Sequence, residues 1–238
     1  MNKRTTLSTL LAAATMTSVA SAVSVTIPFN SHDRIVVSGT TGFGNEVTFQ
    51  EPGGGHTVTV HAQEQYDPSG NGSKRVDTFR DGAELGVYSN GLGVTNTYGD
   101  HEHTVDNAGW DDRVVFSFGE DCDVALTAAR LVAYGDTDIT IWYQDGNDIW
   151  QVLSPAVNEG GSSSREAVFN SGLQLSDTWA ISGTLPSLDT EYNDAFKIKS
   201  ITFHKPDNPG TPEAGHTALL FGMTLLGMGT LRRRARRK

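Results

Sequence analysis

Short runs of alternating apolar and polar residues recur along the middle of this chain, and they constrain its fold more than any other feature. The first run is Val23-Ser24-Val25-Thr26-Ile27, and the later runs are similarly rich in β-branched and aromatic residues. A period of two places alternate side chains on opposite faces of a strand, so each run predicts a strand. The other predicted strands are residues 35–37, 46–49, 57–60, 113–118, 124–134, 138–143, 149–153, 179–182 and 196–203.

Turn-forming residues separate many of these runs. Asp81-Gly82, Asn90-Gly91 and Asp145-Gly146 are pairs typical of tight turns. No segment has the period of a helix of three turns, although residues 123–131 could form a shorter one. We therefore expect residues 23–205 to form one all-β domain, an antiparallel β-sandwich with a jelly-roll-like arrangement.

The first 22 residues have the three parts of a secretory signal peptide. Lys3 and Arg4 are basic, residues 7–19 are mildly apolar, and Ala20-Ser21-Ala22 has the small-x-small pattern of a cleavage site. We expect signal peptidase to cut before Val23, with Ala20 and Ala22 as the recognised residues.

The last 33 residues also fall into parts with different chemistry. Residues 206–216 are a proline-containing linker that includes Pro212-Glu213-Ala214-Gly215, residues 217–231 carry no charge, and residues 232–238 contain six arginines and lysines. A membrane-spanning helix needs ~20 apolar residues, and long basic side chains at its end extend a shorter run. The pattern predicts one transmembrane helix over 217–231 whose basic end stays in the cytoplasm.

This order of motif, apolar helix and basic end resembles the C-terminal sorting signal of bacterial PEP-CTERM proteins, in a VPDxG-like variant. Pro212 and Glu213 match the first two motif positions, Ala214 replaces the usual second proline, and Gly215 is closer to the variant. The resemblance implies recognition and cleavage near the motif by an exosortase, a membrane cysteine transpeptidase or protease.

Residues 106–143 resemble a block that recurs in PEP-CTERM surface proteins. The block consists of a D-N-x-G-x-x-D stretch, an F-x-F strand and a G-D-x-D-I strand. The matching segments here are residues 106–112, 116–118 and 135–139. The resemblance implies a β-sandwich with an extracellular role and no known reaction.

The central region is strongly acidic. The chain carries 18 Lys and Arg against 28 Asp and Glu; residues 1–22 and 211–238 hold eight of the basic residues and one acidic residue. That leaves 10 against 27, a net charge of −17 for residues 23–210, which disfavours nucleic-acid binding. Cys122 is the only cysteine, so no disulfide framework is expected, and its neighbours Asp121 and Asp123 favour an inert thiol.

Acidic loops in this region are candidates for a calcium site. Calcium takes six to eight oxygen ligands, which Asp and Asn side chains supply. The candidate ligands are Asp106, Asn107, Asp111, Asp136 and Asp138. The alternative is that the same residues form solvated turns stabilised by Asx hydrogen bonds.

Two further hypotheses concern ligand binding and catalysis. Trp142 and Trp150 should lie near each other across a hairpin and offer a candidate glycan platform, with Trp179 as a further candidate; the alternative is sheet packing. His101 and His103 resemble the His-x-His pair of metal-binding cupins, with His204 as the later histidine, but no glutamate follows at the expected place unless Asp106 serves.

No serine-hydrolase, zinc-protease or phosphate-loop motif occurs, so the sequence predicts no enzyme. The function that we expect is a structural or adhesive protein, exported to the cell surface or extracellular matrix after exosortase processing. A binder of extracellular polysaccharide is the first alternative, and a secreted metal-dependent enzyme is the second.

Overall fold

The computed structural model describes residues 23–29, 42, 44–66, 78–97, 103–107, 110–119, 122–153, 162–169, 174–183 and 193–206. All of them belong to one compact unit, Ala22–Pro206. The signal peptide, the predicted strand at 35–37, the sorting motif, the predicted membrane helix and the basic end lie outside these described residues.

Within the described ranges, no helix is long and apolar enough to cross a membrane.

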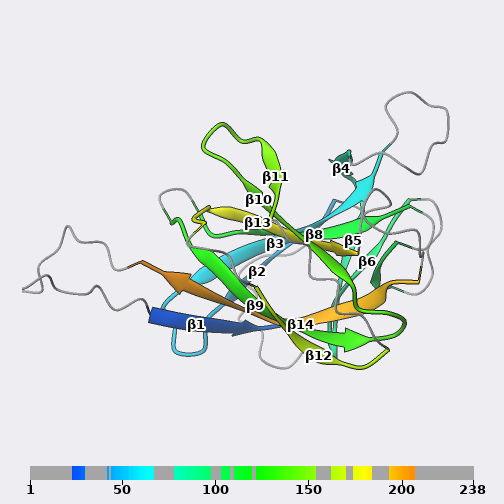
Figure 1. Ribbon diagram of the computed structural model, residues 1–238, viewed down its shortest axis with the longest axis horizontal. Coiled ribbons are helices and arrows are strands. Elements are labelled where there is room, and N and C mark those ends of the chain that lie inside the picture. Colours follow the sequence, from blue (N-terminus) through cyan, green and yellow to red (C-terminus); the bar gives the residue numbers. More distant parts are fainter. Residues whose placement is uncertain are drawn as a thin grey trace, which may run out of the picture. The chain divides into compact units, whose positions relative to one another are not determined.

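The first of two antiparallel sheets is built around the long strand β14 (Ala195–Lys205), and we call it the β14 sheet (Figure 1). On one side β14 pairs with β9 (Ala125–Ala133), which pairs with the edge strand β12 (Arg165–Val168). The remaining strands of this sheet are β6 (Gly91–Thr95), which pairs with β14 and with β5 (Glu84–Tyr88), and β1 (Val23–Pro28) and β7 (Val105–Asp106), which both pair with β14.

The second sheet is built around β8 (Asp112–Ser117), and we call it the β8 sheet. β8 pairs with β3 (Thr57–Gln65) and with β13 (Thr178–Gly183). The strands further out are β2 (Glu46–Gln50) and β4 (Phe79–Asp81), which both pair with β3, and β10 (Ile139–Gln144) and β11 (Trp150–Val152) beyond β13. Two antiparallel sheets without a helix among the described residues confirm the prediction of an all-β, sandwich-like fold.

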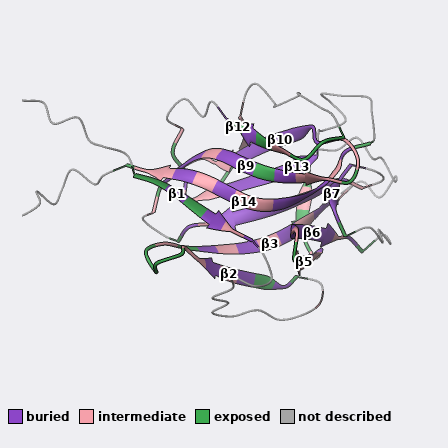
Figure 2. Cartoon of the chain, turned by 90° about the horizontal axis from the view of Figure 1, so that it is seen from below, coloured by how far each residue is buried: buried purple, intermediate pink, exposed green. Residues whose placement is uncertain are grey.

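The core lies between the sheets and follows the sequence alternation. Along β3 every second residue from Val58 to Glu64 is buried, and β1 alternates in the same way (Figure 2). Trp179 is fully buried in this core, and its indole N–H donates to the backbone oxygens of Val124 and Ser176. One continuous cluster includes residues of both sheets, among them Ile27, Leu131, Ile198 and Phe203 from the β14 sheet and Val60, Phe116, Ile141 and Ile181 from the β8 sheet.

The first and last described strands lie side by side. β1 and β14 are antiparallel over six residue pairs, from Val23 opposite Lys205 to Pro28 opposite Ser200. The chain therefore enters and leaves the described unit at the same end (Figure 1).

The structure confirms the strand predicted at residues 124–134, which is β9. Residues 123–131 do not form the short helix that was also considered. β9 pairs with β14 on one side and β12 on the other, and this sheet pairing overrides the helical tendency of its alanines.

Five strands were not predicted, namely β4, β5, β6, β7 and β12. β6 shows the reason most clearly, because its two glycines look like strand breakers in the sequence. A Cβ on Gly93 would overlap the backbone carbonyl oxygen of His103. The glycine is needed there because two backbones pass in direct contact.

Candidate functional site

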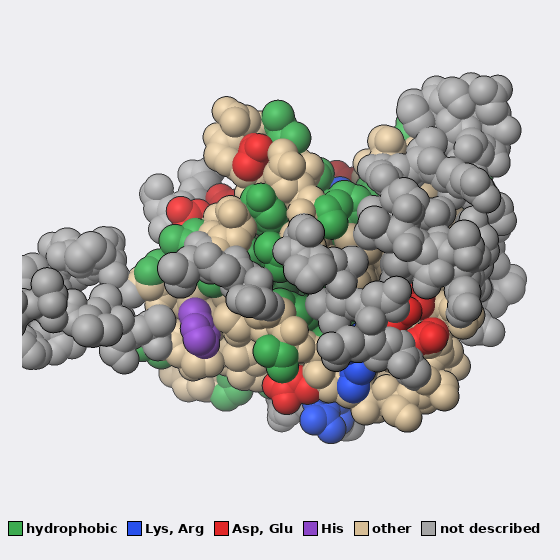
Figure 3. Space-filling view, in the orientation of Figure 1, with side chains coloured by type: hydrophobic (Ala, Val, Ile, Leu, Met, Phe, Trp, Pro, Cys, Tyr) green, Lys and Arg blue, Asp and Glu red, His purple; other side chains and the backbone are tan. Residues whose placement is uncertain are grey.

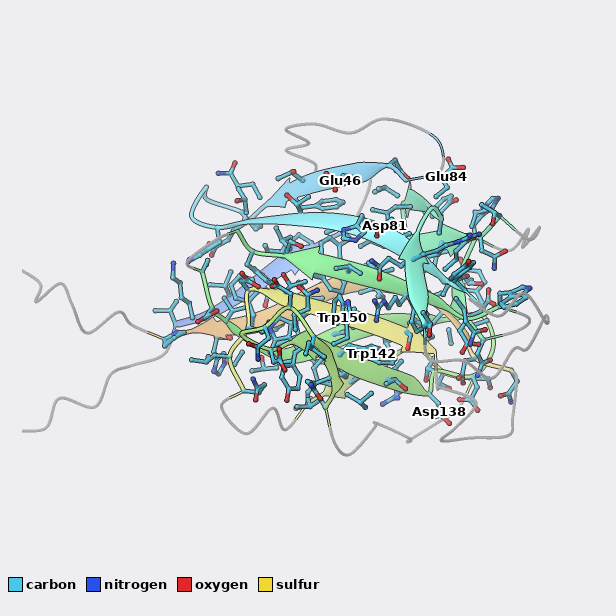
Figure 4. The ribbon with its side chains drawn as sticks, turned by 90° about the horizontal axis from the view of Figure 1, so that it is seen from above. Glu46, Asp81, Glu84, Asp138, Trp142 and Trp150 are labelled. Atoms are coloured by element: carbon cyan, nitrogen blue, oxygen red, sulfur yellow. The ribbon has the colours of Figure 1, made fainter. Side chains whose placement is uncertain are left out.

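Three carboxylates come together near the start of β10. One oxygen each from Asp136, Asp138 and Asp194 lies within 4.8 Å of the others. Asp138 and Asp194 are buried, with 6% and 2% exposure, and Asp136 is half-buried. Figure 4 labels Asp138 beyond the end of β10 that lies away from Trp142 and Trp150. We call these three residues the carboxylate cluster.

Backbone pairing between distant segments assembles the carboxylate cluster. Asp136 and Asp194 form an isolated parallel bridge just before β14 begins. The amide of Asp136 donates to the Asn193 oxygen at 2.8 Å, and the amide of Ala195 donates to the Asp136 oxygen at 2.9 Å. A Cβ on Gly135 would overlap the Asn193 oxygen, so the preceding glycine permits this close approach.

Asn107 holds Asp194 in place. Its side-chain nitrogen donates to Asp194 Oδ2 at 2.6 Å, and its side-chain oxygen accepts from the backbone amide of Asp194 at 3.0 Å. Both polar ends of the Asn107 side chain are therefore used to orient Asp194. Arg165 holds the loop that carries Asp136 and Asp138, because it donates to the hydroxyl and backbone oxygens of Thr137 at 2.9 and 2.7 Å.

The spacing of the carboxylate cluster suits an oxygen-liganded cation. Two ligands on opposite sides of a calcium ion, each 2.3–2.6 Å away, are about 4.6–5.2 Å apart. Three oxygens within 4.8 Å of one another can therefore share one ion. If calcium binds here, Asp136, Asp138 and Asp194 would be its ligands and Asn107 would orient one of them.

The structure separates the predicted calcium ligands. Asp136 and Asp138 belong to the carboxylate cluster, and Asn107 lies beside it. Asp106 accepts a hydrogen bond from Thr104 at 3.1 Å, and Asp111 lies against Gln65, whose amide donates to it at 3.3 Å. Neither belongs to the group found among the described residues.

Sequence reasoning missed Asp194. It lies 56 positions after Asp138, in a segment that also contains Asp189 and Glu191. Only the pairing of the segments before β10 and β14 brings the two together. An Asn-Asp pair before a strand is an ordinary turn pattern, so nothing in the sequence connects Asp194 with the loop at 136–138.

A second candidate site, an arginine among aromatic side chains, lies on the outer face of the β8 sheet. Arg113, on the central strand, is 2% exposed and surrounded by aromatic rings. Its guanidinium carbon lies 4.3 Å from the ring centre of Phe79, 4.1 Å from that of Trp150 and 5.3 Å from that of Trp142. We call these four residues the arginine cage. Figures 1 and 3 show the β10–β11 hairpin and β4 rising on either side of this face, with hydrophobic side chains between them.

Electrostatics in the arginine cage are unusual. Burial lowers the pKa of Arg113 to about 9, while the charge of nearby Asp81 opposes the shift. The guanidinium is therefore still charged at neutral pH. Its Nε donates to Gln63 Oε1 at 2.6 Å, and Asp81 accepts from Gln63 Nε2 at 2.6 Å. The side-chain amide of Gln63 therefore links Asp81 to Arg113, and the two charged side chains form no direct ion pair.

The predicted neighbours Trp142 and Trp150 both pack on Arg113 from one hairpin. Trp142 is only 4% exposed; its indole N–H donates to Ser182 Oγ at 3.1 Å and its ring meets Phe79 edge to face. Trp150 is half-buried and lies on the edge strand β11. Of the two predicted platform residues, Trp150 is therefore the one with ring surface available. Trp179 is buried in the core.

His103 does not have the strand conformation that the cupin-like hypothesis requires. His103 lies before β7 with φ of 53°, a left-handed conformation that strands do not contain, and its ring bonds Thr95. The backbone carbonyl of His103 lies against Gly93, and the residue before Gly93, Leu92, pairs with Ile198 of β14. His204 is six residues further along β14, about 20 Å away at the rise of a strand, so the two cannot share one ion. His101 lies outside the described residues.

Cys122 is a free, half-buried cysteine that packs against the core.

Comparisons with protein-family models, with curated proteins and with solved structures gave no significant match.

Proposed function

We propose that this chain is an exported protein of the cell surface or extracellular matrix with a structural or adhesive role. Signal peptidase removes residues 1–22, and the helix at 217–231 holds the chain in the membrane. An exosortase then acts near Pro212-Glu213. The jelly-roll-like arrangement of the sandwich is part of the same proposal.

The arrangement of β1 and β14 is the observation that best supports this proposal. β1 begins at Val23, directly after the expected signal-peptidase site, and β14 ends at Lys205, directly before the proline-containing linker. The buried apolar residues of the described part run from Val25 to Phe203. Cleavage at either expected site would therefore leave these strands and their core intact.

The processing step can be tested by the mass of the mature protein. Antibodies against the sandwich recover the protein from cells with and without an active exosortase, and intact-mass spectrometry identifies its ends. With the exosortase, we expect a product that begins at Val23 and lacks residues 232–238. Without it, we expect the basic end to be retained.

The variant Pro212→Ala/Glu213→Ala should retain the basic end even when the exosortase is active, whereas Thr211→Ala is a matched control outside the motif. A wild-type product that still carries Arg232 to Lys238 in exosortase-competent cells would refute the processing proposal.

Glycan binding is the second candidate function. The half-buried ring of Trp150 supports it, because aromatic faces on a sheet surface are suited to stacking against sugar rings. Loss of binding on a glycan array after Trp150→Ala, with Trp110→Ala as control, would favour this candidate over a purely structural role.

A further inference from the structure

The charge of Arg113 has little compensation from the described residues. A guanidinium carries five N–H donors. Nε donates to Gln63, and the two terminal nitrogens donate no hydrogen bond to the described residues. Burial of a cation is costly, and it lowers the pKa of Arg113.

The arginine cage encloses most of the guanidinium, and Arg113 is only 2% exposed. The rings of Phe79 and Trp150 lie within 4.3 Å of the guanidinium carbon, and Gln63 occupies the Nε side. Among the described residues, no hydrogen-bond acceptor pairs with the edge formed by the terminal nitrogens. A planar anion that approaches edge-on can accept two parallel hydrogen bonds from such a group.

We propose that the arginine cage binds the carboxylate of an acidic sugar, a uronate residue of a glycan. The carboxylate pairs with the terminal nitrogens of Arg113, and the sugar ring lies against the available surface of Trp150. Asp81, whose side chain is 74% exposed, provides an acceptor for sugar hydroxyls.

A peptide carboxylate fits this surface less well. Peptides commonly bind a sheet by adding a strand to its edge. Arg113 lies on β8, whose two edges are already paired with β3 and β13. The polar groups around Arg113 belong to side chains, which can form hydrogen bonds with the hydroxyl groups of a sugar.

The acidic surface also limits the ligand. Residues 23–210 carry a net charge of −17, so a long polyanion would be repelled. A short uronate segment carries few negative charges, so it is repelled less and one of its carboxylates can pair with Arg113. The inference rests on the second candidate function, glycan binding, and names its ligand class; it requires neither export nor processing of the tail. Equal binding of acidic and neutral sugars would refute the uronate site alone, whereas binding of neither sugar would count against both.

The test uses the full chain purified in detergent micelles, a galacturonate trisaccharide and the neutral galactose trisaccharide of the same linkage. Calorimetry should show that the uronate binds at least about tenfold more tightly than the neutral sugar, since charge-assisted pairs exceed neutral ones by this order. Equal binding of both sugars would overturn the proposal.

Variants then identify the cation. Arg113→Met should weaken uronate binding about tenfold or more, and Arg113→Lys should weaken it as well because the planar fork is lost. Lys197→Met is the matched control: Lys197 is a 5% exposed cation stacked 3.5 Å from the ring centre of Tyr88, on the other sheet. Unchanged binding in folded Arg113→Met would refute the proposal.

A measurement on the wild-type chain remains decisive if the Arg113 variants do not fold. In nuclear magnetic resonance spectra, the uronate should shift the indole N–H signals of Trp142 and Trp150 but not that of Trp179, which is fully buried between the sheets. Absence of these shifts at millimolar ligand, or binding of an acetylated acidic tripeptide in place of the uronate, would overturn it. None of these readouts depends on whether an exosortase cleaves the tail.

Discussion

Gly93→Ala should destabilise the protein strongly, because two backbones meet at this glycine. A methyl group there would overlap the carbonyl oxygen of His103 and lie 2.8 Å from its carbonyl carbon. Ordinary carbon–carbon contacts are about 3.5–4.0 Å, so β6 and the segment before β7 would have to separate by about 1 Å. A backbone carbonyl cannot rotate away as a flexible side chain can.

The expected loss in the free energy of unfolding is about 3 kcal/mol, the upper end of the usual range for overpacking. For a domain of this size that corresponds to a decrease in Tm of about 6–12 °C. Urea titration followed by tryptophan fluorescence measures the loss, with buried Trp179 as the main reporter.

Gly146→Ala is the matched control, because a Cβ there meets nothing within 4 Å and no positive φ is required. We expect its stability to stay within about 0.5 kcal/mol of the wild type or to rise slightly. A Gly93→Ala protein as stable as the control would refute the close backbone contact.

The other two predictions concern calcium and pH. Millimolar calcium should raise the Tm of the wild type by several degrees, reversibly with a chelator, and should not raise that of Asp138→Asn, which removes one carboxylate of the cluster; equal shifts in both proteins would argue against the cluster as the site. Burial lowers the pKa of His61, against the opposing charge of Asp81, so the folded state favours the neutral ring. The resulting stability is present above the unfolded pKa of about 6.5 and is lost as the pH falls through that value toward the lower folded pKa. His61→Gln should therefore reduce the slope of stability against pH below 6.5 in urea titrations, and an unchanged slope would contradict the assignment.

Local patterns predicted much of the sandwich. The alternation in residues 57–60 and 138–143 depends on neighbouring residues, so it is visible in the sequence. The pair Asn90-Gly91 predicted the hairpin between β5 and β6 to within one residue, because the turn is formed by Ser89 and Asn90. The proximity of Trp142 and Trp150 was predicted for the same reason, since one hairpin carries both residues.

Residues that meet only through sheet pairing were not predictable. Phe79 reaches the arginine cage from the short strand β4, and the burial of Arg113 depends on rings from three strands. Charged residues in alternating runs usually lie on a solvated face, so nothing in the sequence indicates that Arg113 is buried. The fold buried it by placing aromatic side chains around it.

The sequence by itself determined that the central region is acidic and strand-forming, because composition and periodicity are properties of the chain alone. Tertiary structure decided which polar residues meet. Asn107, Asp138 and Asp194 are far apart in the chain, and they come together only because β14 pairs with β7 and β9 and fixes the segments beside them. Hydrogen-bond register between distant strands is a global property of the fold, and no local pattern encodes it.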